Sequence, residues 1–98
     1  MESYTIELTG TFRKDLKVAK KRGLDMNELY AVVEMLRTDK PLPVRFRNHK
    51  LTSDYKDYWE CHIEPDWLLI YEKDTEIRLL SLYRTGTHAD LFGKGKKR

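Results

Sequence analysis

The sequence predicts an α+β domain in which an N-terminal strand and an αα-hairpin pack on a mainly antiparallel sheet. Three observations lead to this prediction. The chain has 98 residues, the size of one compact domain. Its apolar residues change from a period of two to a helical period near Phe12. Its second half holds three short strand-like runs whose brief links favour antiparallel neighbours.

The first element is expected to be a half-buried strand. Tyr4, Ile6 and Leu8 alternate with polar or charged residues, and this alternation is typical of a strand with one face in the core.

A helix is expected to follow this strand. Phe12, Leu16 and Ala19 have the i, i+4, i+7 spacing of a helix with one apolar face, and their neighbours are mostly charged. Gly23 stands where a left-handed cap would end the helix. The connection to the next element is therefore short.

A second helix completes the predicted αα-hairpin. Asp25 and Glu28 have the spacing of a capping box. The apolar stripe that follows consists of Met26, Leu29, Val33 and Leu36. Pro41 and Pro43 end the helical region, because proline lacks an amide hydrogen and restricts the residue before it.

The remaining chain predicts a loop and then a strand meander. The loop carries the basic residues Arg45, Arg47 and Lys50, and a polar turn at residues 52–57 leads to strands at 58–63, 67–73 and 77–84. In the first of these strands, Trp59, Cys61 and Ile63 share the face expected to enter the core. We expect a single domain over residues 1–93 and a flexible basic tail over 94–98.

Composition excludes several classes of protein. Hydrophobic residues make up 40% of the chain, which argues against wholesale disorder. The longest apolar run, at residues 67–71, is far shorter than the roughly 20 residues that span a membrane, and the N-terminus does not resemble a signal peptide. The single cysteine, Cys61, excludes an internal disulfide and a multi-thiolate zinc site. These features predict a cytoplasmic protein with no membrane partner.

The net charge is a weak argument for a polyanionic partner. The formal charge is +3, but four cationic residues lie in the tail, and without them the formal charge is -1. Any argument for RNA binding must therefore rest on where the charges lie.

Chemistry-bearing side chains gather in the second half of the chain. The histidines are His49, His62 and His88, and a meander can bring them to one edge together with Asp66 and Arg84. A metal site formed by the histidines and Asp66 is disfavoured, because no local ligand spacing supports it. We therefore expect no metal and no cofactor.

Two segments resemble a known family. Residues 62–71, HIEPDWLLIY, and residues 84–93, RTGTHADLFG, are similar to the signatures of YafQ-type toxins in the RelE/ParE superfamily, and the likeness extends over residues 4–93. The resemblance implies a RelE-like fold and a type II toxin that acts as a ribosome-dependent mRNA endoribonuclease and inhibits translation. It implies three partners: the 70S ribosome, mRNA and a cognate DinJ-like antitoxin with a ribbon-helix-helix DNA-binding fold.

The resemblance also implies a set of active-site residues. They are His49, His62, Asp66, Trp67, Arg84, His88 and Phe92. In metal-independent RNA cleavage by the 2′-hydroxyl, His88 is the preferred general acid, His62 or Asp66 the base, and His49 assists. Arg84 would stabilise the charge on the phosphate. Trp67 and Phe92 would stack on bases, and the basic loop of Arg45, Arg47 and Lys50 would bind RNA.

Simpler explanations exist for each of these residues. Histidines are often solvated surface groups, and Trp67 at a strand start would often be a packing residue. Asp66 could cap a turn, and Arg84 could pair with Asp66 or Glu60. Two other functions stay open: a non-nucleolytic ParE-like gyrase inhibitor, and a general RNA-binding module without chemistry.

Overall fold

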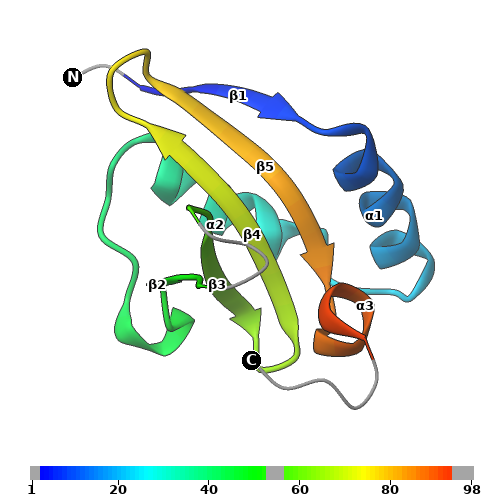
Figure 1. Cartoon of the computed structure of the whole chain (residues 1–98). Helices are drawn as coiled ribbons and strands as arrows, with labels where there is room; N and C mark the ends of the chain where they lie inside the picture. The colour runs from blue at the N-terminus through cyan, green and yellow to red at the C-terminus, as the bar shows by residue number, and fades with distance from the viewer. Residues whose placement is uncertain (1–2, 53–56, 94–98) are drawn as a thin grey trace.

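The computed structural model describes residues 3–52 and 57–93 and arranges them around a five-stranded sheet. Along the sheet the strand order is β1-β5-β4-β3-β2 (Figure 1). The predicted tail at 94–98 and most of the predicted turn at 52–57 lie outside the described residues.

The sheet is mainly antiparallel, as predicted. The elements in chain order are β1 (Thr5–Leu8), α1 (Gly10–Lys21), α2 (Met26–Arg37), the 3-10 helix η1 (Val44–Phe46), β2 (His49–Lys50), β3 (Trp59–Glu64), β4 (Trp67–Asp74), β5 (Leu79–Gly86) and α3 (His88–Phe92). Only the pairing of β1 with β5 is parallel among the described strands. The predicted strand, αα-hairpin and meander are confirmed, but Ile6 on β1 is 37% exposed and does not lie in the core as expected.

The two long helices begin and end at the residues that favour those positions. Thr9 caps α1 by accepting the Phe12 backbone N–H at 2.9 Å. Gly23 follows α1 with a φ of 80°, which a glycine adopts without strain. Asp25 caps α2 by accepting the Asn27 N–H, so the predicted cap is present. These caps fix the short connection of the hairpin.

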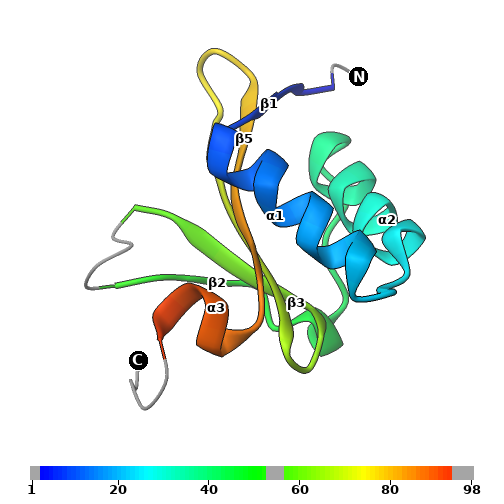
Figure 2. The same cartoon turned by 90° about the vertical axis from the view of Figure 1, so that its right-hand side faces the viewer.

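The central strand β4 is buried on both faces, between the helical hairpin and α3. Figure 2 shows α1 and α2 on one side of the sheet and α3 on the other. On β4, Trp67, Leu69 and Tyr71 face the hairpin, whereas Leu68 and Ile70 belong to a second apolar cluster beside α3. Part of the face opposite the hairpin is covered by α3.

Four details differ from the predictions. The five-residue helix α3 and the two-residue strand β2 were not predicted. β5 begins at Leu79, two residues later than predicted, because Asp74 closes a turn by accepting the N–H groups of Glu76 and Ile77. Trp59 is 36% exposed and does not join the core, although Cys61 and Ile63 on the same strand do.

Candidate active site

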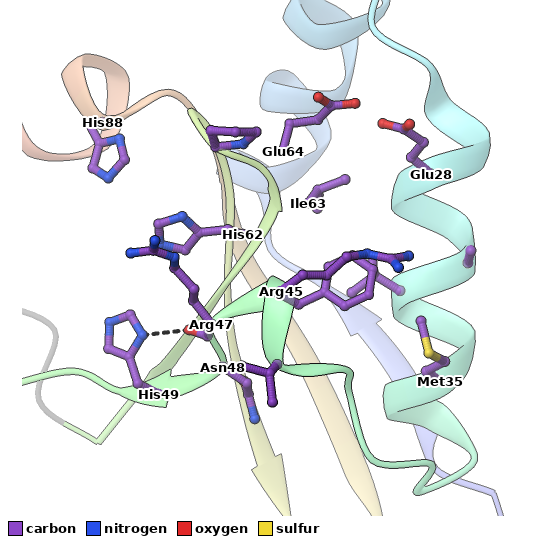
Figure 3. A pocket seen from close by; sticks show the side chains of 15 residues that line it. Glu28, Met35, Arg45, Arg47, Asn48, His49, His62, Ile63, Glu64 and His88 are labelled. Atoms are coloured by element: carbon purple, nitrogen blue, oxygen red, sulfur yellow. Dashed lines mark hydrogen bonds between the residues drawn. The ribbon is translucent and has the colours of Figure 1, made fainter.

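Three imidazole rings form a row across the end of the sheet. His49 lies on β2, His62 on β3 and His88 at the start of α3 (Figure 3). The ring centroids of His49 and His62 are 6.2 Å apart, and those of His62 and His88 are 5.6 Å apart. All three line one cleft of about 1440 Å³. The fold therefore brings together the three histidines that were predicted from the sequence to meet.

A buried carboxylate lies beneath two of these rings. Glu60 is completely buried, and its Oε1 lies 3.2 Å from His49 Nε2 and 3.5 Å from His62 Nε2. A buried carboxylate is costly without partners, and these two imidazoles supply them. Glu60 was not among the residues predicted for the site. Glu60 stands two residues before His62 on the same strand, so alternation places both side chains on one face. This spacing is the signal that could have added Glu60 to the predicted site.

The backbone fixes the orientation of His49. Its Nδ1 lies 2.7 Å from the carbonyl oxygen of Arg47, and because a carbonyl only accepts, Nδ1 carries the hydrogen. Nε2 is therefore the atom that faces Glu60. Arg47 has a left-handed conformation with a φ of 48°, which is uncommon for a residue other than glycine. The Tyr71 hydroxyl donates to Asn48 Oδ1 and anchors this turn to the sheet.

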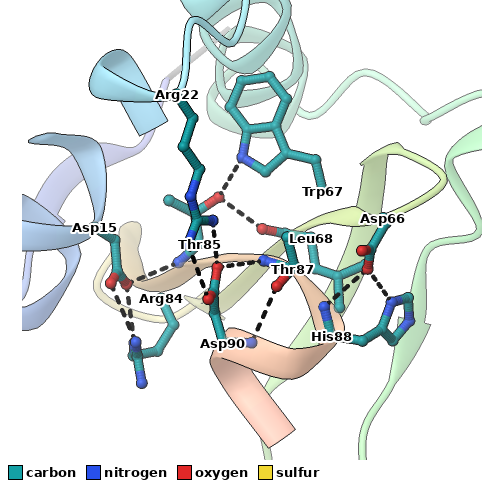
Figure 4. A network of polar contacts seen from close by, with 10 residues as sticks. All are labelled: Asp15, Arg22, Asp66, Trp67, Leu68, Arg84, Thr85, Thr87, His88 and Asp90. Atoms are coloured by element: carbon teal, nitrogen blue, oxygen red, sulfur yellow. Dashed lines mark hydrogen bonds and ion pairs between the residues drawn. The ribbon is translucent and has the colours of Figure 1, made fainter. Parts of the chain in front are cut away.

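Asp66 holds His88. Its Oδ1 accepts both the backbone N–H of His88 at 2.9 Å and the ring Nδ1–H at 2.5 Å (Figure 4). These two bonds keep the pKa of the Asp66 carboxyl below its usual value, and the backbone bond has the larger effect. The contact leaves Nε2 of His88 for a substrate. Asp66 thus orients His88, a role that differs from the predicted base.

His62 has the environment of a neutral imidazole. Burial lowers its pKa from the ordinary value of 6.5, and the neighbouring His88 and His49 act in the same direction. The charge of Glu60 opposes this change. A neutral imidazole at cellular pH can accept a proton, which makes His62 the better base candidate.

The cationic side of the cleft comes from η1 and the turn that follows it. Figure 3 shows Arg47 extending toward His62 and Arg45 lying nearer to α2. The Arg45 guanidinium lies 4.6 Å from the centroid of the Phe46 ring. Arg47 is exposed, and its guanidinium has no hydrogen bond or ion pair with any residue of the described part of the chain. Lys50, also exposed, lies on β2.

Arg84 does not line the cleft that holds the histidines, and its predicted place at the phosphate stays a prediction. Its Nε and Nη2 donate to the two carboxylate oxygens of Asp15 on α1, at 2.9 and 3.1 Å. Figure 4 shows Arg84 and His88 at opposite ends of the polar network. The ion pair of Arg84 is thus with Asp15, a partner that the sequence did not indicate.

Trp67 is a core residue, which corrects its predicted role in base stacking. It is 3% exposed, and its Nε1–H donates to the Thr85 hydroxyl at 2.9 Å. A ring in this position has no free face for a nucleotide. Phe92 is partly buried against the second cluster, which contains Leu91. Its proposed contact with RNA stays a prediction.

Neither a metal cluster nor a membrane span is present in the described part of the chain. Within residues 3–52 and 57–93, no group of three or more His, Cys, Asp or Glu has the arrangement of a metal site. None of the helices in the same ranges is long and apolar enough to cross a membrane.

Comparison with known proteins agrees with the resemblance found in the sequence. The family of bacterial toxins of type II toxin-antitoxin systems, YafQ, matches residues 4–93. The mRNA interferase toxin YafQ of Escherichia coli (strain B / BL21-DE3) is 49% identical over 89 residues, which is 90% of this chain and 95% of that protein.

Two solved structures are similar over most of their length. The DinJ-YafQ toxin-antitoxin complex of E. coli has a TM-score of 0.85 and 43% identity, covering 93% of this chain and 99% of the other. A metal-bound toxin from Helicobacter pylori also has a TM-score of 0.85 and 43% identity, over 91% and 99% of the two chains. The chain therefore belongs to the YafQ family of bacterial toxins of type II toxin-antitoxin systems.

Proposed function

We propose that this toxin cleaves mRNA positioned in the ribosomal A site, by attack of the message's own 2′-hydroxyl, and so inhibits translation. One observation carries the proposal: three imidazoles line a single cleft, and each of them contacts a carboxylate, either Glu60 or Asp66. This set can supply a base, an acid and the groups that stabilise their charged forms. The name of the E. coli relative, an mRNA interferase toxin, supports the same activity.

In the proposed reaction, His62 accepts the proton of the 2′-hydroxyl. The 2′-oxygen attacks the phosphorus, and the bond from phosphorus to the 5′-oxygen breaks. His88 donates a proton to the departing 5′-oxygen, and the upstream product ends in a 2′,3′-cyclic phosphate. Asp66 holds His88 through its ring Nδ1–H, and Glu60 stabilises the proton on His62. His49 assists by contacting the same Glu60 carboxylate.

Arg47 takes the role that was predicted for Arg84. It lines the same cleft as His49, His62 and His88, whereas Arg84 is bound by Asp15. A guanidinium offers a planar pair of donors to phosphate oxygens as negative charge builds up in the transition state. Arg45 and Lys50 would contact neighbouring phosphates.

The ribosome would supply what the protein lacks for binding RNA alone. Without the tail, the formal charge is -1, so the affinity for free RNA should be weak at physiological salt. A message held on the ribosome would present its scissile phosphate to the row of histidines in a reactive geometry. This positioning replaces the missing binding energy.

A cognate antitoxin of the DinJ type, with a ribbon-helix-helix fold, is the proposed inhibitor in the cytoplasm. The E. coli relative forms a complex with DinJ, which supports this assignment. An antitoxin would act by covering the cleft or by making the toxin too large for the A site. Toxin and antitoxin would meet where translation takes place.

One experiment separates this function from its rivals. The same message is incubated free and bound to ribosomes, with EDTA present, and the cleavage ends are mapped. We expect cleavage of the bound message, cyclic or 3′-phosphate ends, and no cleavage when the scissile nucleotide lacks its 2′-hydroxyl. Equal cleavage of free RNA would indicate an ordinary ribonuclease. A strict metal requirement would contradict the mechanism, and binding without cleavage would favour the RNA-binding module. Inhibition of gyrase without cleavage would favour the ParE-like function.

A further inference from the structure

The helix that carries His88 is too short to hold itself in place. α3 has five residues, and isolated helices of this length are unstable in water. His88 is its first residue, so any change in the tilt of α3 moves the imidazole relative to His62. Asp66 restrains the helix on the side of the β3-β4 turn. A second polar restraint lies on the side of the helical hairpin.

That restraint comes from the end of α1. The Nη1 of Arg22 donates to Asp90 Oδ2 at 2.6 Å, and its Nη2 donates to Oδ1 at 3.2 Å (Figure 4). Arg22 is the C-terminal cap of α1, 68 residues before Asp90 in the chain. A two-bonded pair of guanidinium and carboxylate fixes orientation as well as distance.

The same carboxylate also builds the first turn of α3. Asp90 Oδ2 accepts the backbone N–H of Thr87 at 2.9 Å, and the Thr87 hydroxyl accepts the Asp90 N–H at 3.0 Å. This capping box encloses His88, which lies between its two members. The group that receives Arg22 is therefore the group that closes the turn carrying the imidazole.

Close packing leaves this turn little freedom. A side chain at Gly86, the last residue of β5, would lie 2.9 Å from both Cβ and Oδ2 of Asp90. The Arg22 guanidinium, together with the Thr87 bonds, holds the pKa of the Asp90 carboxyl down to about 2. The carboxylate is consequently charged throughout the physiological range.

We propose that Arg22 and Asp90 are positioning residues, which tie α3 to the helical hairpin and hold His88 in register with His62. This inference rests on the proposed function for its effect on catalysis. The alternative is an ordinary surface ion pair, since the two side chains are 43% and 30% exposed and such pairs contribute little to stability. The two explanations differ in what they predict for α3 itself.

The test uses Arg22→Ala, Asp90→Asn and a matched control. Asp90→Asn keeps an oxygen for the Thr87 N–H but loses the charge that binds Arg22. Arg37→Ala is the control, because Arg37 forms a comparable exposed pair with Glu34 on α2 away from the site. Cleavage of ribosome-bound message is measured as kcat and KM. Melting, hydrogen exchange of the α3 amides and NMR titration of His88 are measured on the free protein.

We expect both test variants to lower kcat by about tenfold to a hundredfold with KM changed less than about twofold, as for a misplaced reacting group. Their α3 amides should exchange faster and the His88 titration should shift, while the melting temperature stays close to that of the control. Arg22→Lys should restore part of the kcat. Variants that match Arg37→Ala in every measurement would overturn the proposal.

The two proposals can fail separately. If the unaltered protein does not cleave bound message, the proposed function is wrong, but exchange and titration still decide whether Arg22 and Asp90 hold α3. If the protein cleaves and these variants cleave equally well, the positioning role is wrong and the function stands. Loss of cleavage together with global unfolding in Arg22→Ala would also contradict it, since the pair would then be a stability element.

Discussion

At the scale of single residues, each histidine of the cleft has a different set of contacts. His49 is oriented by a backbone carbonyl, His62 by burial above Glu60, and His88 by Asp66. The carbonyl fixes a hydrogen on Nδ1 of His49, burial favours the neutral ring of His62, and the Asp66 carboxylate orients the ring of His88. Three chemically identical side chains therefore acquire different tasks.

Replacing His88 with alanine should remove most of the cleavage and leave the fold intact. The side chain is 41% exposed and its proposed task is proton transfer, so kcat should fall by about 10²- to 10⁴-fold. Cleavage of ribosome-bound message and the melting temperature are the two measurements. Ala89→Gln on the same helix serves as the control. A folded His88→Ala protein with near-normal activity would remove His88 from the mechanism.

Replacing Glu60 with glutamine should change how activity depends on pH. Glu60 raises the pKa of His62, so its loss should lower that pKa further and move the acid limb of the activity profile to lower pH. The maximal rate should also fall, because the charged form of His62 that arises during the reaction loses stabilisation. The fall should be about tenfold for each unit by which the pKa of His62 decreases. A purely structural role would lower the melting temperature without moving the acid limb, and that result would exclude Glu60 from the chemistry.

Stability should decrease on acidification because of His62. In the folded state its pKa lies below 6.5, so between the folded and unfolded values the unfolded chain binds more protons. This contribution to the free energy of unfolding is present above about pH 6.5 and is lost as the pH falls through that window. Urea denaturation at about pH 7.5 and about pH 5.5 should show a larger loss in the unaltered protein than in His62→Gln. Equal losses in the two proteins would speak against burial as the cause.

At the scale of secondary-structure elements, β4 explains why one predicted RNA contact was wrong. The run at residues 67–71 is apolar at every position, so alternation could not assign Trp67 to a face. In the structure the strand is buried on both sides and Trp67 faces the hairpin. A central strand of this kind supplies core to two clusters at once.

Two matched substitutions test this assignment. Trp67→Leu should lower stability by about 2–5 kcal/mol and leave KM for the message unchanged in the folded fraction. Phe92→Leu should raise KM if Phe92 contacts a base, with a smaller loss of stability because the ring is only partly buried. Melting curves and cleavage kinetics give both quantities. A raised KM in Trp67→Leu would return Trp67 to the binding surface.

The sequence was informative wherever a local period or cap determines an element. Alternation and helical spacing predicted β1, α1, α2 and the meander, and the three histidines were correctly expected at one edge. The helix α3 was missed because five residues give no period, although Thr87 and Asp90 have the spacing of a capping box. The pairing of Arg84 with Asp15 joins residues 69 positions apart, and no local pattern reveals it.

At the scale of the whole molecule, positive charge is concentrated at the C-terminal tail. Removing residues 94–98 changes the formal charge from +3 to -1. All elements from β1 to α3 lie before the tail, so the truncated protein should melt at the same temperature. Ribosome binding should become weaker and less sensitive to salt, by about one unit of the salt slope for each phosphate that the tail no longer neutralises. Cleavage assays at several salt concentrations check this, and complete loss of cleavage would assign the tail an essential role.

The parallel pairing of the first strand with the last has a consequence for how the protein is made. Thr5 lies opposite Leu79 and Leu8 opposite Leu82, so β1 finds its partner only after nearly the whole chain exists. Such distant pairings are slow to form. A nascent chain can neither pair β1 with β5 nor place His88 beside His62 until residues 79–88 have been made. The order of the elements thus leaves the row of histidines incomplete until the last of the described strands and α3 have been synthesised.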